Sequence, residues 1–339
     1  MRIWALAAVA LALAACSLRA AATAPASEGP IRVTATPLPL DPADPRRNRL
    51  GEFVFAGALW LKSPDTSLFG GFSDLKVTDR GDMISESDEG SVLRAHIVLG
   101  NDGRPTGLEN ASISVLKGLD GKPLPGKVEA DSEGVVVWPS GDLMVSFERD
   151  HRIWVYPAAG GPPHAVPKPD VAMPENEGME GLALAPREGP DAYWVGIEGG
   201  EIWLCHLAKA CRKTPGQFPP ALGYRLPALF EMTEGDLVVE HHSWTPVTGT
   251  HLTISVIDNP TTHPAPKVKA QLAIASPLTV DNIEGVAVVS RPDGVRRFYL
   301  ISDDNFSRAQ RTLLMAFDWT PPKAAQGAAA GTAPRTATP

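Results

Sequence analysis

The sequence lacks the short motifs that identify many enzyme classes. It has no Gly-rich phosphate-binding loop ending in Lys-Ser or Lys-Thr, no H-E-x-x-H zinc motif and no EF-hand calcium loop. The Arg-His-Gly motif of histidine acid phosphatases is absent, and neither Ser73 nor Ser243 lies in a G-x-S-x-G elbow. These absences exclude P-loop nucleotide hydrolases, zinc proteases of this type and α/β-hydrolases.

Positive charge is scarce, whereas glycine and proline are plentiful. The 339 residues contain 31 Lys and Arg against 39 Asp and Glu, and the basic residues form no block. A net charge of −8 without a basic patch excludes nucleic acid as an expected partner. The 31 glycines and 33 prolines lie among short apolar runs, which favours short strands and turns over long helices.

The N-terminus carries an export signal. Arg2 precedes an apolar stretch that ends in small residues before Cys16, which predicts a signal peptide over residues 1–15. The sequence Leu-Ala-Ala-Cys that ends at Cys16 resembles the lipobox of bacterial lipoproteins, which implies lipidation of Cys16 and a stable membrane anchor. Ser17, in place of Asp, implies the outer membrane, with the protein facing the periplasm. The alternative is an ordinary secretory signal with an incidental cysteine, and either signal predicts export.

Two further cysteines lie close together in IWLCHLAKACRK, which is typical of a strand followed by a short loop. An exported compartment permits disulfides, so we expect a local bridge between Cys205 and Cys211. Two free thiols are the alternative. A zinc site would need closer paired spacing and more ligands.

Low-complexity segments flank a single folded body. Residues 16–31 are small and Ala-rich, which predicts a flexible tether. Residues 321–339 are similar in composition and are expected to be a disordered tail. Residues 32–320 contain no linker, so we expect one domain there.

One sequence motif recurs within this body. It consists of a Glu-Gly or similar pair, an apolar strand, a Gly-containing turn, and a second strand that ends in an acid. Examples are DSEGVVVWPSGDLMVSFER, NEGMEGLALAP and DNIEGVAVVSRPDG. When the repeats are aligned on Asp74, Glu133, Glu180 and Glu284, four steps span the alignment and each averages about 52 residues. This period predicts an all-β chain folded as a β-propeller, with six blades favoured and five as the alternative. A β-sandwich is the alternative fold.

These repeats, together with GGFSDL and the final block YLISDDNFSRAQRTLLMAFDW, resemble the phytase-like domain family ("esterase-like activity of phytase") of exported bacterial proteins. The resemblance covers about residues 70–318. It implies an esterase-like or phosphoester-hydrolysing activity and repeated Glu and Asp as working residues. The chain departs from the family pattern at Ser73-Asp74 and in the fourth repeat, which has no Glu-Gly.

Carboxylates at equivalent positions of a propeller meet around its central channel. The strand heads would bring together Asp74, Glu133, Glu180 and Glu284, and the ends of the second strands would add Asp88, Glu148, Glu198, Glu240, Asp303 and Asp304. Such a ring suits Ca²⁺, which takes six to eight oxygen ligands. The alternatives are metal-free acid–base catalysis and purely structural capping of the backbone.

The sequence therefore predicts an exported, lipid-anchored phosphoester hydrolase with a calcium-binding channel mouth. Glu180 and Glu284 are the catalytic candidates, and Arg149 and Arg308 are candidates for binding the phosphate of a small phosphoester. We expect His241 and His242 to be surface histidines, and a role as ligands or as a base is the alternative. The alternative function is a non-catalytic envelope propeller that binds a small ligand or a partner protein. The sequence does not determine the oligomeric state.

Overall fold

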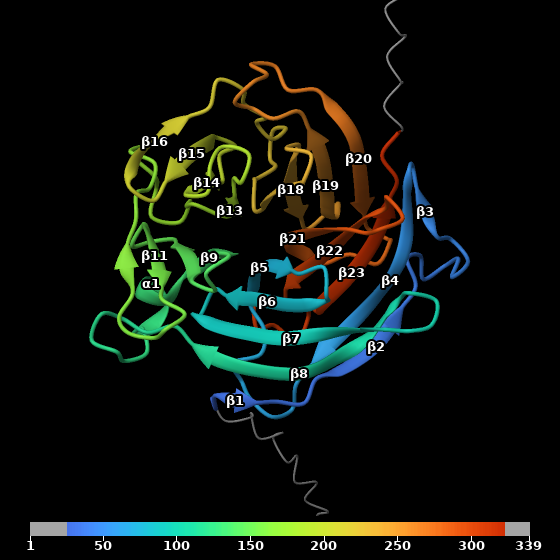
Figure 1. Ribbon diagram of the computed structural model, residues 1–339. Coiled ribbons are helices and arrows are strands. Elements are labelled where there is room, and N and C mark those ends of the chain that lie inside the picture. The colour runs from blue at the N-terminus through green and yellow to red at the C-terminus, as the bar shows by residue number, and fades with distance from the viewer. Residues whose placement is uncertain (1–25, 323–339) are drawn as a thin grey trace, which may run out of the picture.

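Each repeat folds into an antiparallel β-sheet in the computed structural model, which describes residues 26–322. Five sheets surround one centre, so that each forms a blade (Figure 1). The prediction of an all-β propeller is confirmed. The predicted signal peptide, Cys16 and residues 323–339 of the predicted tail lie outside the described residues.

The strands of the first four blades follow the chain. Blade 1 contains β5 (Phe72–Val77), β6 (Asp82–Ser87), β7 (Ser91–Leu99), β8 (Pro105–Val115) and, at its outer edge, β1 (Gly29–Pro30). Blade 2 contains β9 (Ser132–Val137), β10 (Leu143–Phe147), β11 (Arg152–Tyr156) and β12 (His164–Ala165). Blade 3 contains β13 (Gly181–Leu184), β14 (Ala192–Gly196), β15 (Ile202–His206) and β16 (Lys209–Lys213). Blade 4 contains β17 (Leu229–Glu231), β18 (Leu237–Thr245), β19 (Gly249–Ile257) and β20 (Val268–Ala275).

Blade 5 joins the two ends of the described chain. It contains β21 (Asn282–Ser290), β22 (Arg296–Asp303), β23 (Thr312–Trp319), β4 (Phe53–Lys62), β2 (Thr34–Leu38) and β3 (Arg49–Leu50). The N-terminal β4 pairs with the C-terminal β23, and Leu59 lies opposite Leu314. The preference for six blades was therefore wrong, and the five-blade alternative is correct. The residues outside the four repeat steps do not form a sixth sheet, because they complete blade 5.

The core lies between the blades, because each sheet buries both of its faces against its neighbours. Five clusters of buried apolar side chains fill these interfaces. Between blades 4 and 5, Phe53 of β4 stacks on Trp319 and meets Phe298 edge-on, with ring centroids 6.1 and 5.3 Å apart. Among residues 26–322 the only helix is the short α1 (Gly126–Ala130). None of the described helices is long and apolar enough to cross a bilayer.

The glycine of each Glu-Gly pair lets the innermost strands of adjacent blades approach closely. A Cβ on Gly134 would lie 2.7 Å from the carbonyl oxygen of Glu180 in the next blade. A Cβ on Gly285 would lie 2.7 Å from the backbone nitrogen of Leu75, where blade 5 meets blade 1. The Glu-Gly motif therefore recurs partly because only glycine fits at these contacts.

Candidate functional site

The inner strands begin around a cavity of about 290 Å³ near the centre of the propeller. Eight carboxylates line it: Asp88, Asp131, Glu133, Glu148, Glu180, Glu198, Glu284 and Asp303. Lys127, Arg149, Arg225 and His242 lie among them. We call this group of acidic and basic side chains the acidic mouth. The structure thus brings together most of the acids that the sequence selected.

Each second strand, or the turn directly after it, contributes one side chain to the mouth. These side chains are Asp88, Glu148, Glu198, His242 and Asp303, one from each of the five blades. They occupy equivalent positions opposite the segment that leads into the inner strand. The backbone N–H groups of Asp88, Glu148, Glu198 and His242 donate to the carbonyl oxygens of Gly71, Asp131, Gly178 and Arg225, and Asp303 pairs with Asn282. The five-fold repeat of the fold therefore builds this ring.

In blade 4 the ring position belongs to His242 and not to the expected Glu240. Glu240 lies two residues earlier on β18, where its side chain is fully buried. Burial, with a smaller effect from Asp74, raises its pKa well above the usual range. The residue that faces the mouth depends on where the inner strand begins. The fourth repeat has no Glu-Gly pair to mark that position, so its sequence did not distinguish His242 from Glu240.

The heads of three inner strands point into the mouth, but Asp74 does not. Glu133, Glu180 and Glu284 line the cavity, and each precedes the glycine that pairs with the second strand. The register of blade 1 pairs Asp74 with Glu86, so Asp74 occupies the glycine position.

The carboxylate of Asp74 lies between blades 1 and 2. It accepts a hydrogen bond of 3.0 Å from the backbone N–H of Val135 and forms an ion pair with Lys76. Asp74 is shifted by one residue relative to Glu133, Glu180 and Glu284, and such a shift turns a strand side chain to the opposite face. Asp74 is therefore not part of the acidic mouth.

Two other predicted residues lie outside the cavity lining. Asp304 accepts hydrogen bonds from the backbone N–H groups of Gly71 and Phe306, both of 3.0 Å, and from the hydroxyl of Thr312, of 2.9 Å. These bonds fix the turn between β22 and β23 against blade 1. Arg308, in the same turn, is exposed and is not among the lining residues.

Glu148 lies at the centre of the carboxylate cluster, close to four other acids. Ligand oxygens of Asp131, Glu133 and Glu148 lie within 4.8 Å of one another, and so do those of Glu148, Glu180 and Glu198. Glu148 is therefore common to both groups. The sequence did not select Asp131 as a site residue, although it opens the second repeat directly before Ser132-Glu133.

Burial and mutual repulsion raise the pKa values of these acids. Burial is the main cause for Glu133 and Glu180, whose pKa values lie well above the usual range, and neighbouring carboxylates add to it. Burial, with Asp131 and Glu198 nearby, raises the pKa of Glu148 to about 7. Burial likewise raises the pKa of Asp303 to about 7. A cation in the mouth would relieve this repulsion.

Basic side chains form the rim of the mouth. Lys127 Nζ lies 2.7 Å from Asp131 and 2.5 Å from Asp88, and Arg149 also pairs with Asp131. Arg225 pairs with one oxygen of Glu198, whereas the other oxygen, Oε2, is buried without a hydrogen-bond partner among the described residues. The sequence did not identify Lys127 or Arg225, because neither belongs to a repeated motif.

The two histidines of blade 4 are not surface residues, contrary to expectation. His241 is buried and stacks on Phe218, and burial lowers its pKa to about 4. His242 Nδ1 lies 2.9 Å from the carbonyl oxygen of Ile283, and burial lowers its pKa. His242 therefore adds a neutral imidazole to the acidic mouth at neutral pH.

Comparisons with known proteins are in agreement with the repeat motifs. The family model described as "Phytase-like: Esterase-like activity of phytase" matches residues 67–306, from just before β5 to just after β22. No curated protein matches the chain.

Several solved structures are similar to this chain. The Mala s 1 allergen of Malassezia sympodialis has 14% identity and a TM-score of 0.43, covering 80% of this chain and 91% of its own. Virginiamycin B lyase from Staphylococcus aureus has 8% identity and a TM-score of 0.41, covering 84% of this chain and 99% of its own. A streptogramin B lyase has 12% identity and a TM-score of 0.40, covering 75% and 84%.

Proposed function

The chain belongs to the phytase-like family, and from this premise we propose that its acidic mouth is the active site of a phosphoester hydrolase. The observation that carries the proposal is the convergence of carboxylates from two adjacent blades on Glu148. If the acids only capped backbone N–H groups, each carboxylate would bond to the backbone of its own blade. Here acids from blades 2 and 3 share one cavity.

We further propose that calcium binds in this mouth. The donor set fits a hard cation, because carboxylate oxygens gather within 4.8 Å and Oε2 of Glu198 is buried without a hydrogen-bond partner among the described residues. Asp131, Glu133, Glu148, Glu180 and Glu198 would hold the ion. When bound, such an ion polarises a phosphoryl oxygen and lowers the pKa of a coordinated water.

The protein side chains would bind and orient the substrate. Arg149 and Arg225 lie at the rim, with side chains 24% and 58% exposed, so their guanidinium groups can reach the phosphate of a small phosphoester. Arg308 is exposed and is not among the lining residues, so the proposal does not include it. Glu180 and Glu284, both half-buried in the lining of the mouth, are the acids proposed to exchange protons with the reacting groups.

Export and lipidation form part of the same proposal. The N-terminal pattern supports cleavage before Cys16 and anchoring at the outer membrane, facing the periplasm. A cell that expresses the chain should yield a membrane-associated, acylated protein, and a Cys16→Ser variant should lose the label from radioactive palmitate.

The ion pairs of the rim favour a second candidate, a non-catalytic propeller that binds a ligand or partner. Arg225 already pairs with Glu198, and both Lys127 and Arg149 pair with Asp131. These bases neutralise part of the acidic charge without a metal. The two candidates differ in turnover, so one experiment separates them.

The test is calcium titration of the purified protein, monitored by thermal unfolding and by turnover of a phosphomonoester and a phosphodiester. Calcium that binds the native state raises the melting temperature by mass action. We expect Glu148→Gln to abolish this stabilisation and to lower turnover by at least about 100-fold. Glu52→Gln, a change in the exposed turn between β3 and β4, is the matched control.

Each outcome selects one function. Stabilisation with turnover, both lost in Glu148→Gln, supports the metal-assisted hydrolase. Stabilisation without turnover supports the ligand-binding propeller. If calcium neither stabilises the protein nor supports turnover, the hydrolase proposal is wrong.

A further inference from the structure

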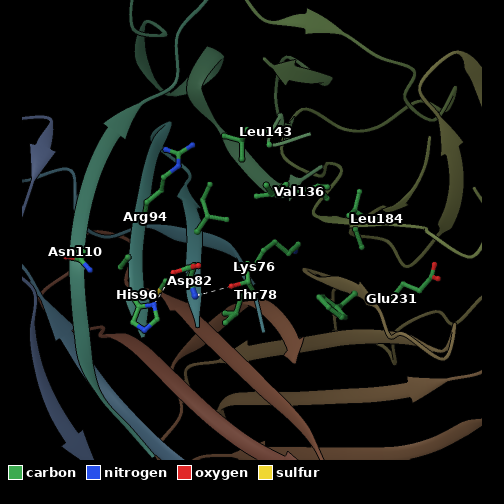
Figure 2. Close-up of a pocket in the computed structure, with 18 of the residues that line it drawn as sticks. Lys76, Thr78, Asp82, Arg94, His96, Asn110, Val136, Leu143, Leu184 and Glu231 are labelled. Atoms are coloured by element: carbon green, nitrogen blue, oxygen red, sulfur yellow. Dashed lines mark hydrogen bonds and ion pairs between the residues drawn. The ribbon is translucent and has the colours of Figure 1, made fainter. Parts of the chain in front are cut away.

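A second and larger cavity, of about 800 Å³, lies at the other end of the inner strands (Figure 2). β9 begins at the acidic mouth with Glu133 and ends at this cavity with Val136 and Val137, and β13 likewise ends there with Leu184. The volume lies within the range of small-molecule sites. We call this space the apolar cavity, and the proposed hydrolase does not use it.

Apolar side chains from four blades form most of its wall. They are Met83, Ile84, Val136, Leu143, Leu184 and Phe230. Figure 2 shows Val136, Leu143 and Leu184 side by side on one side of the space, with Arg94 and His96 on the other. An occupant would therefore bury an apolar body against the first group.

Most polar groups in the lining already have partners. Asp82 lies 3.0 Å from His96 Nδ1, and Lys76 pairs with Asp74. Glu231 accepts a hydrogen bond of 2.6 Å from the indole N–H of Trp194. Glu109 is exposed at the edge, next to His96 on the adjacent strand, where water solvates its charge. These groups stabilise the wall and do not need a ligand.

Arg94 is the exception. Within residues 26–322, no carboxylate lies within ion-pair distance of its guanidinium, although the side chain lines the cavity on β7. Arg94 is exposed at the edge of the cavity, so a ligand can reach its guanidinium, and partial burial of the group lowers its pKa. A planar guanidinium can hold a carboxylate through two parallel hydrogen bonds.

We propose that the apolar cavity binds an amphipathic organic anion, with an alkyl body against the apolar wall and one carboxylate on Arg94. The single unpaired cation at the edge of an apolar wall sets the charge of this ligand, and the cavity volume sets its size. The site is independent of the acidic mouth, so it can be correct whether or not the protein is a hydrolase.

The test is calorimetric titration of the purified protein with dodecanoate and, in parallel, with dodecanol. We expect saturable binding of dodecanoate and much weaker binding of the alcohol. Arg94→Gln should weaken dodecanoate binding roughly tenfold or more, the effect of losing one charge-assisted pair, whereas Arg94→Lys should retain part of it. Arg308→Gln, at an exposed arginine outside both cavities, is the matched control.

A second variant tests the wall. Leu184→Asp places a negative charge among the apolar side chains and should abolish dodecanoate binding, whereas Glu198→Gln in the acidic mouth should leave it unchanged. Equal binding of acid and alcohol, or unchanged binding in Arg94→Gln, would show that Arg94 does not recognise the ligand and would overturn the proposal. Unchanged binding in Leu184→Asp would overturn it equally.

Discussion

The two residues of each Glu-Gly pair have different functions. The glutamate points into the acidic mouth, as Glu133 and Glu180 do, and the glycine makes room for the neighbouring inner strand. Blade 1 shows what happens without this pair. There Asp74 occupies the glycine position and uses its side chain to bond the backbone of blade 2 at Val135.

At the residue scale, Glu240 gives the first prediction. Both of its carboxylate oxygens are buried without a hydrogen-bond partner among the described residues, and burial raises its pKa well above the usual range. The folded state therefore holds a proton that the unfolded state releases above its pKa of about 4.3. This contribution to stability is greatest below that pH and is lost as the pH rises toward the folded-state pKa.

We therefore expect Glu240→Gln to raise the free energy of unfolding at pH 7.5 and to change it little at pH 4, because glutamine takes up no proton. Urea unfolding of both proteins at the two pH values measures the difference. Glu52→Gln is the exposed control. A difference between Glu240→Gln and wild type that is the same at both pH values would contradict the prediction.

At the scale of elements, the inner strands are positioned by close backbone contacts. Gly134 of β9 lies against the carbonyl of Glu180, and Gly181 of β13 lies against Leu229 of β17. The mouth lies at the heads of these same strands. Its geometry therefore depends on how closely the strands pack.

Gly134→Ala should destabilise the fold by about 1–3 kcal/mol, because the new Cβ would lie 2.7 Å from three neighbouring atoms. Gly107→Ala on β8 is the matched control: no atom lies within 4 Å of its Cβ, and alanine should be neutral or stabilise slightly. Chemical unfolding measures both. Equal effects would show that the close contact does not constrain the strand.

The β15–β16 hairpin contains a disulfide between Cys205 and Cys211, whose Cα atoms lie 4.1 Å apart. Its short loop predicts that reduction lowers the free energy of unfolding by about 2 kcal/mol, through the entropy of the unfolded chain. Unfolding with and without dithiothreitol measures the effect, and a Cys211→Ala variant should not respond to the reductant. If wild type also fails to respond, the cysteines are two free thiols.

At the scale of the whole molecule, strands from the two ends of the described chain close the circle of five blades. The N-terminal β4 pairs with the C-terminal β23, so blade 5 needs both (Figure 1). The aromatic contacts of Phe53 with Phe298 and Trp319 fill the interface behind this seam. Closure in this way places the acidic mouth at one end of the inner strands and the apolar cavity at the other.

Phe53→Ala should cost about 3–5 kcal/mol of unfolding free energy, because the aromatic ring is fully buried. We expect hydrogen exchange to accelerate in β23 as well as in β4, since the two strands share hydrogen bonds. Val128→Ala, at an exposed position in α1, should cost little. A loss below about 1 kcal/mol for Phe53→Ala would show that the seam does not depend on this packing.

The sequence by itself determined the all-β propeller, its family and most of the acids that meet in the mouth. These features follow from local repetition, because three of the repeats contain the same Glu-Gly pair at the start of an apolar strand. Glu133, Glu180 and Glu284 could be selected together for this reason.

Only the tertiary structure decided how many blades there are and which side chains share the mouth. Blade number depends on the pairing of β4 with β23, two strands from opposite ends of the chain. Asp74 lies outside the mouth because a shift of one residue turns a side chain to the opposite face of its sheet. His242 takes the place expected for Glu240 because Arg225 pairs with His242, two residues further along β18. Register and closure are set by packing between blades, which no single repeat contains.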